Sequence, residues 1–437
     1  MSTDVMFFFD SEDFTSNHAA DALRELASIC TEEGVRGHFA LVGLLAYQLQ
    51  AWGRRDVLDA LRPHEIGSHT YGHSLHPNIS EMADVERFEE AYANITRSEA
   101  EGLGLIKGVT SRRDILFAVP PGSAQPYAAL YAYADMGIPF YCDSVVTDAR
   151  NRERCYCNMR IIGYTRSVES LFCFERPDLD AVLDDLATRD RVIIYTHPNM
   201  AYYSVCWDMV NYNGQNLHPW GEWEEAPRCS EAETRAYFDG FRTLIRRLKA
   251  DPRFTFTDLR TLQAAEKPRR AVTPADLPVI RRALARELGP VSDPESLSVS
   301  DIFLACCAFL RGESVYVPGK VYGFLEPPRG VTEPVTVTAE SLKAAARTLD
   351  VSGFLPPSIP VGSAVLGPAD FLYAALDVLS GAETVTLQPR AQLNRMDAFP
   401  QLENHHPAGG WVHSPDFRDE YLSDRLRLQA WTLRWGG

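Results

Sequence analysis

The sequence lacks the features of several large protein classes. Its 43 Lys and Arg are outnumbered by 59 Asp and Glu, giving a formal net charge of -16, whereas binding to nucleic acid or to an anionic membrane surface needs an excess of cations. It has no apolar run of about 18 or more residues that could span a membrane. The N-terminal MSTDVMFFFDSEDF lacks the basic start and long apolar stretch of a secretory signal. These absences predict a cytoplasmic protein that binds neither nucleic acid nor membranes.

The cysteines also lack the pattern of a disulfide framework. There are nine, an odd number, spread from Cys30 to Cys307, whereas small secreted proteins carry dense, even sets. Cys306 and Cys307 lie within the apolar run DIFLACCAFL and are expected to be small buried hydrophobes. Cys206 and Cys229 are less clear, because they lie in a polar segment.

The spacing of apolar runs predicts an α/β fold. From Val5 to about Leu262 short apolar runs alternate with helix-like stretches, as expected for repeated strand and helix units around a parallel sheet or barrel. One such stretch, HAADALRELASICTEEG, has its apolar residues three and four apart and stops at Gly34. About seven units predict an incomplete barrel. The strand candidates are VMFFF, GHFALVG, HEIGSH, DILFAVP, IPFYCDS, RVIIYTH and FTFTDL.

A change of pattern predicts a second, smaller domain of mixed α/β structure. The prolines of EKPRRAVTPADLP disfavour a continuous helix, so we expect domains at 1–265 and 266–437. In the second domain Thr338 is expected to cap the helix TAESLKAAARTL, and Gly381 to end the helix PADFLYAALDVLSG. Between these helices, GFLPPSIPVGSAVLG predicts turns and short extended pieces.

The segment 201–230 breaks the strand and helix rhythm. It is rich in Trp and Tyr and has no clean period. Loops of this length are usually functional or disordered, and the aromatic content argues against disorder. We interpret it as a lid or binding loop.

Two histidines with metal-ligand spacing form the strongest signal of chemistry. His69 and His73 are separated by three residues in HTYGH, directly after HEIGS. On a helical turn, residues four apart lie on the same face, so both imidazoles could reach one metal ion. The nearby His76 is off that face and is expected to be structural or to support the ligands.

Carboxylates follow the first predicted strand. FFFDSEDF places Asp10, Glu12 and Asp13 at the end of an apolar run, and the carboxyl ends of strands in α/β folds face the ligand crevice. In an extended chain Asp10 and Glu12 share a side, whereas Asp13 faces away. Capping of the next helix by Asp10 or Asp13 is the structural alternative.

A third histidine ends a late strand. His197 closes RVIIYTH, just before Pro198, and an imidazole with an ordinary pKa of about 6.5 can donate or accept a proton. Alone, this residue could equally be a core histidine. The combination of late histidine, carboxylates and histidine pair is more informative than any one member.

Taken in order, these motifs resemble those of the polysaccharide deacetylase family, carbohydrate esterase family 4, with its chitooligosaccharide deacetylase homology domain. The family's TFDDGP, HxxxH, RxPxG and final strand-end His are similar to FFDSED, HEIGSHTYGH, AVPPGS and IIYTH here. The resemblance covers about residues 1–265. It implies a distorted (β/α) barrel holding one divalent metal, with Zn2+ favoured over Ni2+, Co2+ or Mn2+.

Two departures from the family pattern leave residues to be assigned. Ser11 follows Asp10 where the family has a second, metal-binding Asp, so Glu12 or Asp13 must replace it, and geometry favours Glu12. The third motif lacks its Arg before Pro-Pro-Gly, so the tuning of the catalytic base differs. The arginines that could take over are Arg112 and Arg113.

The resemblance also implies roles for individual residues. Asp10 would take a proton from the attacking water, and His197 would protonate the leaving amine, since an amine is a poor leaving group unless protonated. The metal ligands would be Glu12, His69 and His73. The substrate contacts would include Pro121, Gly122 and Asp143, with capping of a strand end as the alternative for Asp143. Independently of the resemblance, the rings of Tyr202 and Trp207 could stack on a sugar, with packing of their loop onto the barrel as the alternative.

The predicted function is removal of an N-acyl group, such as N-acetyl, from an amino sugar or a related small amide. The protein could form a homo-oligomer. The altered motifs leave two alternatives, a cyclic amide or imide hydrolase resembling metal-independent allantoinase, and a non-catalytic carbohydrate-binding protein. Residues 298–390 faintly resemble pseudomurein-binding repeats, which leaves the role of the second domain open.

Overall fold

The chain divides into two compact units in the computed structural model, which describes residues 2–123, 126–142, 150–212, 218–219, 221–394, 413–414 and 416–436. Unit 1 comprises residues 1–152, 161–265 and 405–422; unit 2 comprises residues 153–160, 266–404 and 423–437. These units differ from the contiguous domains expected at 1–265 and 266–437. In unit 2, β6 (Arg154–Tyr156) pairs antiparallel with β15 (Arg434–Trp435), which ties an early segment to the end of the chain.

Strand β1 (Thr3–Ser11) is the centre of unit 1. It pairs in parallel with β9 (Arg191–Thr196). On its other side, the first residues of β1 pair with β10 (Phe254–Phe256), and the residues from Phe7 onward pair with β2 (Gly37–Leu41). The residues from Val5 to Phe9 are all buried, as expected for a parallel strand covered on both faces. Because the strands are parallel, their carboxyl ends meet at one end of the sheet.

The strands of unit 1 follow the order β5-β4-β3-β2-β1-β9-β8, with β10 beside β1. The α/β class is confirmed, and each of the seven predicted strands is present. The sheet is a partly closed, barrel-like one. The short β8 escaped prediction because two residues cannot carry an alternating pattern. The remaining strands are β3 (Glu65–Ser68), β4 (Phe117–Ala118), β5 (Phe140–Cys142) and β8 (Arg166–Ser167), and β7 (Met159–Ile162) crosses the boundary between the units.

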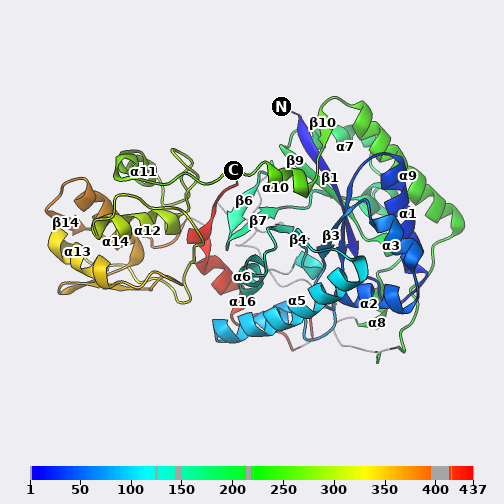
Figure 1. Ribbon diagram of the computed structural model, residues 1–437, viewed down its shortest axis with the longest axis horizontal. Coiled ribbons are helices and arrows are strands. Elements are labelled where there is room, and N and C mark those ends of the chain that lie inside the picture. Colours follow the sequence, from blue (N-terminus) through cyan, green and yellow to red (C-terminus); the bar gives the residue numbers. More distant parts are fainter. Residues whose placement is uncertain are drawn as a thin grey trace. The chain divides into compact units, whose positions relative to one another are not determined.

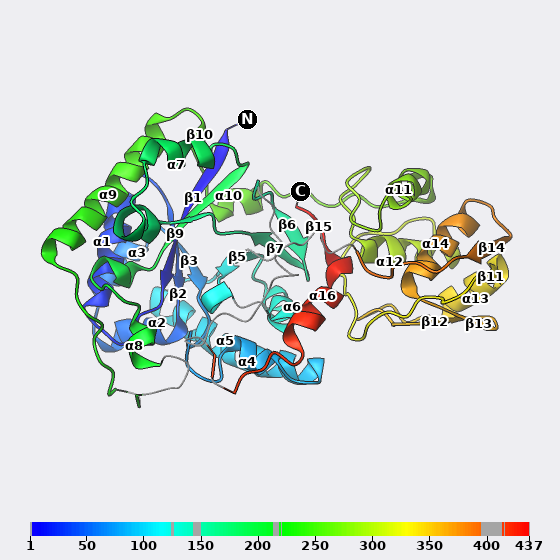
Figure 2. The same ribbon diagram turned by 180° about the vertical axis from the view of Figure 1, so that it is seen from behind.

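Helices cover the sheet of unit 1. In Figures 1 and 2, α1, α3 and α9 lie together beside β1 to β3, and α5 packs against α2 and α6. Helix α1 ends just before Gly34, which has a φ of 65°, as predicted. No helix among the described residues is both long and apolar enough to cross a membrane. The bounds are α1 (Ala19–Glu32), α2 (Gly43–Ala51), α3 (Arg55–Leu61), α4 (Ile79–Ala83), α5 (Phe88–Thr110), α6 (Tyr127–Asp135), α7 (Leu179–Leu186), α8 (Trp207–Asn211), α9 (Glu231–Ala250) and α10 (Leu259–Ala264).

Unit 2 has its own apolar core, built mainly from α12 and α14. The two predicted helices are confirmed. The hydroxyl of Thr338 accepts a hydrogen bond from the Ser341 backbone at the start of α13, and α14 ends before Gly381. Between them β12 and β13 form an antiparallel hairpin. The bounds are α11 (Leu277–Leu284), α12 (Val299–Leu310), β11 (Val335–Thr338), α13 (Ala339–Thr348), β12 (Ile359–Val361), β13 (Ala364–Leu366), α14 (Pro368–Leu379), β14 (Thr384–Leu387) and α16 (Leu422–Leu428).

A buried neutral histidine makes unit 1 sensitive to acid. The Nδ1 of His38 lies 3.0 Å from the Phe7 carbonyl, to which it donates, and its Nε2 accepts from the Leu259 backbone N–H at 3.2 Å. Burial lowers the pKa of His38 to about 4. Between pH 6.5 and 4 the unfolded chain therefore binds a proton that the folded chain does not, so stability falls as the pH falls through this window.

We expect protonation of His38 in the unfolded chain to lower the free energy of unfolding by about 2 kcal/mol when the pH falls from 7 to 5. The figure follows from about 1.36 kcal/mol per pH unit below the ordinary histidine pKa of about 6.5. Urea unfolding of wild type and His38→Gln at both pH values measures it. The variant is expected to be less stable at pH 7 and to lose less on acidification. Equal losses in the two proteins would contradict the assignment.

Candidate active site

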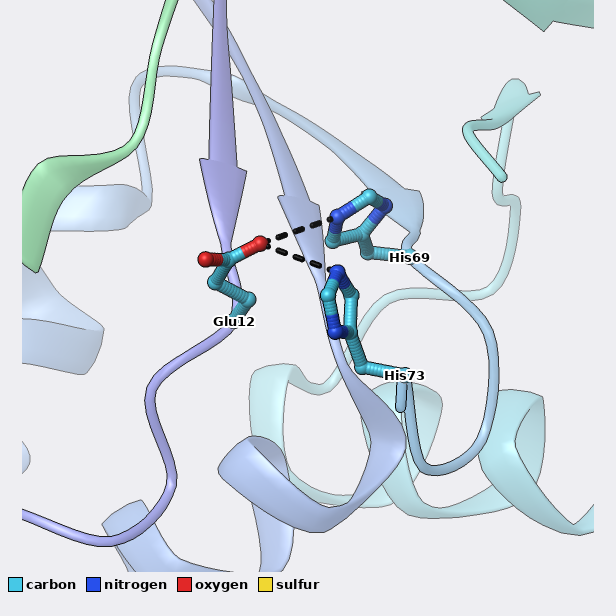
Figure 3. Close-up of side chains that lie close together, drawn as sticks. All are labelled: Glu12, His69 and His73. Carbon is cyan, nitrogen blue, oxygen red and sulfur yellow. Dashed lines mark ion pairs between the residues drawn. The ribbon is translucent and has the colours of Figure 1, made fainter. Parts of the chain in front are cut away.

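Strand β1 delivers its carboxylates to the carboxyl end of the sheet. Asp10 is the second-last residue of this strand, and Glu12 and Asp13 directly follow the strand. All three are buried. The Asp13 side chain points toward the next residues of the chain, where its Oδ1 accepts hydrogen bonds from the Thr15 backbone N–H at 2.9 Å and from the Thr15 hydroxyl at 2.8 Å. Of the two alternatives for the carboxylate ligand, Glu12 is the one that faces the histidine pair (Figure 3).

The HxxxH pair lies in a loop, so its predicted helical placement is wrong. His69 follows β3, and Thr70 and His73 have φ values of 65° and 54°, which lie outside the right-handed helical region. Backbone hydrogen bonds hold the loop to the end of β2, from His69 to Leu41 at 2.8 Å and from Gly43 to Thr70 at 3.0 Å. The spacing matters because the loop folds back, bringing the two imidazoles together.

Two glycines let this loop approach the helices beneath it. A Cβ at Gly102 in α5 would lie 2.9 Å from Cα of Tyr71, and one at Gly43 would lie 2.7 Å from Cα of Gly102. Such distances leave room for no side chain at either position. The backbone of the histidine loop is therefore packed directly against α2 and α5, which restricts the positions of its ligands.

Glu12, His69 and His73 form a buried cluster. Glu12 Oε2 lies 3.0 Å from His73 Nε2 and 3.5 Å from His69 Nε2. His69 Nδ1 lies 2.9 Å from the Val119 carbonyl, to which it donates, and this contact leaves its Nε2 directed at the cluster. Although burial opposes ionisation, the three nearby histidines hold the pKa of Glu12 well below its usual range. One carboxylate and two imidazoles are a ligand set for Zn2+ and similar divalent ions, so the donors fit a metal.

His197 lies beside the cluster and is held by Glu169, a residue that the sequence prediction missed. Glu169 Oε1 accepts hydrogen bonds from the His197 backbone at 2.7 Å and from Thr196 Oγ1 at 2.7 Å, and it lies 3.2 Å from His197 Nδ1. Burial lowers the pKa of His197, but the carboxylates of Glu12, Glu169 and Asp10 outweigh it and raise that pKa to about 10. The imidazole is thus held in its protonated form, as a general acid must be.

The Glu169→Gln variant is expected to lower kcat about 10- to 100-fold with little change in KM. Without the negative charge, the pKa of His197 falls. The high-pH limb of the pH-rate profile, which reports loss of the acid's proton, should then move to lower pH. Steady-state kinetics across pH test this, with Glu231→Gln on the exposed start of α9 as the control. A profile that keeps its position would show that Glu169 does not set the acidity of His197.

Asp10 is held by a tyrosine where the family pattern has an arginine. The Tyr164 hydroxyl donates to Asp10 Oδ1 at 2.5 Å, and His197 Nε2 lies 3.9 Å from Asp10 Oδ2. Burial raises the pKa of Asp10, which makes the carboxylate a better proton acceptor. Tyr164 was missed because the segment around it carries no motif.

The suggestion that Arg112 or Arg113 tunes Asp10 is wrong. Arg112 donates to the carbonyls of Arg62 and His64 at 2.7 and 2.5 Å. Those carbonyls precede β3, whereas the active-site histidines follow it, so Arg112 lies at the opposite end of the strand. Arg113 is exposed. The hydroxyl of Tyr164, and neither of these arginines, contacts Asp10.

A cavity of about 470 Å3 lies over these groups, a volume within the range of small-molecule sites. It brings together Asp10, the Glu12 cluster and His197 at one surface. Gly122 lines it, as expected, whereas the buried Pro121 lies next to the lining residue Pro120. The other lining residues are Val119, Cys142, Tyr164, Thr165, Arg166, Ser167, Ser170 and Tyr195.

The aromatic residues expected to contact substrate do not line this cavity. Trp207 is 1% exposed, with its ring packed against Phe14 and Tyr212, so neither face is left for a sugar. The ring of Tyr202 lies against His18, away from the cavity. The stacking predicted for both is therefore wrong, because their rings pack against residues outside the cavity, among them Phe14, His18 and Phe238. Asp143 lies outside the described residues.

Comparison with known proteins gives distant structural likeness. The sequence matches no family model and no curated protein sequence. A family 4 carbohydrate esterase from Streptomyces lividans in complex with acetate aligns at 12% identity, covering 60% of this chain and 95% of that one, with a TM-score of 0.34. A pseudoenzyme of the same family from Bacillus anthracis aligns at 14% identity, covering 59% and 70%, with a TM-score of 0.32.

The comparison also includes a protein of another activity. The 4-alpha-glucanotransferase from Thermococcus litoralis aligns at 10% identity over 62% of this chain and 41% of that one, with a TM-score of 0.41. One fold can host unrelated chemistries. The chemistry of this chain must therefore be inferred from its own side chains.

Proposed function

We propose that the protein is a metal-dependent hydrolase that removes an N-acyl group, most simply N-acetyl, from an amino sugar or a related small amide. The observation that carries the proposal is the convergence of three kinds of group on one cavity. These are a metal-ligand set of one carboxylate and two imidazoles, a buried carboxylate held by Tyr164, and an imidazole held by Glu169.

The two groups beside the ligand set have complementary acid and base properties. A divalent ion bound by Glu12, His69 and His73 would lower the pKa of water and polarise the acyl carbonyl. Asp10, whose pKa is raised by burial, would in its ionised form take the proton from the attacking water. His197 is held in its protonated form by the neighbouring carboxylates, so it can give a proton to the amine as it leaves. Hydrolysis would release a free amine and a carboxylate such as acetate.

The expected substrate is a small N-acylated molecule that enters the cavity, and not a nucleic acid or a membrane component. A cytoplasmic location, which the sequence predicts, would favour a soluble substrate over an intact cell-wall polymer. The lining offers Arg166, Ser167 and Ser170 as polar contacts beside the catalytic groups. These are suited to hydrogen bonding with a sugar, whereas the described residues of segment 201–230 contribute no ring to the lining of this cavity.

The proposal is tested with wild-type protein by metal analysis and by acetate release from a panel of N-acetylated amino sugars. We expect at least one equivalent of zinc or a similar ion, loss of activity on chelation and recovery when Zn2+ is added back. Hydrolysis of a cyclic imide by metal-free protein would favour the allantoinase-like alternative. Sugar binding without hydrolysis in the metal-loaded protein would favour a binding protein.

A further inference from the structure

A second set of metal-binding side chains lies against the first. Glu12, Cys206 and Asp208 offer two carboxylates and a thiol whose ligand atoms all lie within 4.8 Å of one another. Cys206 directly precedes α8, and Asp208 lies in its first turn. In a tetrahedral zinc site, ligand atoms lie roughly 3.3 to 3.8 Å apart, as follows from bonds of about 2.0 to 2.3 Å. The present separations are all within 4.8 Å, so they exceed these by at most about 1.5 Å, which side-chain rotation can close.

Asp208 is the group that points to a missing ligand. It has no exposed surface, and neither of its carboxylate oxygens accepts a hydrogen bond of ordinary geometry among the described residues. Its neighbours are His73, whose Nδ1 lies 3.4 Å from Oδ2, and the Ser74 hydroxyl and Met209 backbone N–H, whose hydrogen bonds to it fall outside ordinary geometry. A buried carboxylate needs a partner cation or hydrogen bonds to offset the loss of water. These three weak contacts supply only part of that.

The local balance of charge also favours a second cation. Asp208 adds a further buried carboxylate to a site that already holds Glu12, Asp10 and Glu169. The positive partners of these acids are the three imidazoles of His69, His73 and His197. Of these, His69 and His73 must be neutral to bind the first metal. With four carboxylates, the first divalent ion and a protonated His197, the site keeps one net negative charge. A second divalent ion together with a Cys206 thiolate would bring that charge to zero.

We propose that Glu12, Cys206 and Asp208 form a second cation position that takes Zn2+, with Glu12 bridging it to the first. The thiolate selects a soft ion such as zinc over Mg2+ or Ca2+. Pairs of metal ions that lie about 3.5 to 4 Å from each other and share a bridging ligand recur in hydrolases. The second ion would tie α8, and with it the aromatic segment, to the end of β1. The inference rests on the proposed function in that Glu12 serves both positions.

The test is zinc stoichiometry, measured on the full-length protein after removal of metal and reloading. We expect two equivalents in wild type and in Cys229→Ser, a matched change of a partly buried cysteine in the same segment. One equivalent is expected in Cys206→Ser and in Asp208→Asn. Wild type loaded with Co2+ should show the thiolate-to-cobalt charge-transfer absorption, which Cys206→Ser should lack.

The cobalt spectrum of wild type keeps the test independent of how well the variants fold. One equivalent of zinc and no thiolate band would overturn the second position while leaving the proposed function intact. The second position would also be overturned if wild type bound a single ion and Asp208→Asn only weakened its binding. Asp208 would then act only by orienting His73. Two equivalents with hydrolysis absent would support the second position and overturn the proposed function.

Discussion

The His69→Ala variant is expected to lose its catalytic metal and with it all measurable hydrolysis. His69 presents Nε2 to Glu12 while its Nδ1 is held by the Val119 carbonyl, so no other side chain can take its place without moving the loop. Loss of a direct ligand should weaken binding by more than the 10- to 100-fold typical of losing a supporting group. The rate should fall by at least about 10^3-fold, because the ion is what lowers the pKa of water.

The control for this variant is His76→Ala. His76 lies in the same segment, but its Nδ1 is 2.8 Å from Glu81 Oε2, outside the cluster. It should keep both metal and activity. Metal analysis, together with acetate release from the best substrate of the panel, compares the two variants. Full activity in His69→Ala would remove the histidine pair from the mechanism and favour a metal-independent hydrolase.

Much of the fold could be predicted because it depends on local patterns. The run from Val5 to Phe9 is apolar at every position, and only a strand covered on both faces buries such a run. Gly34 and Gly381 ended helices where expected, since both have positive φ. The division into units was less predictable. The pairing of β6 with β15 joins residues about 280 apart in sequence, and no local signal marks it.

The site was predictable where its residues fall within one motif. Glu12 could be favoured over Asp13 because side chains alternate along an extended strand. The residues that support the motifs could not be predicted in this way. Tyr164 and Glu169 reach Asp10 and His197 from a segment with no recognisable pattern, and only the fold brings them together. Trp207 shows the opposite error, since an aromatic in a long loop was taken for a binding residue although it is buried.

The Asp10→Asn variant is expected to lower kcat about 10^3-fold while keeping the metal. The amide is close in size to the carboxylate, and its oxygen can still accept from Tyr164, but it cannot take a proton from water. Loss of a general base typically costs 10^2- to 10^4-fold in rate. Metal content should be unchanged, because Glu12, and not Asp10, faces the histidine pair. This combination separates the proton acceptor from the ligand set.

Tyr164→Phe completes the comparison. It removes the hydrogen bond to Asp10 but leaves the carboxylate, so we expect a loss of only about 10-fold, the equivalent of one hydrogen bond of about 1.4 kcal/mol. Steady-state kinetics and metal analysis on the three proteins measure both effects. If Asp10→Asn retained most of its activity, another group would have to accept the proton, and Glu169 would be the next candidate. If it lost metal as well, Asp10 would belong to the ligand set.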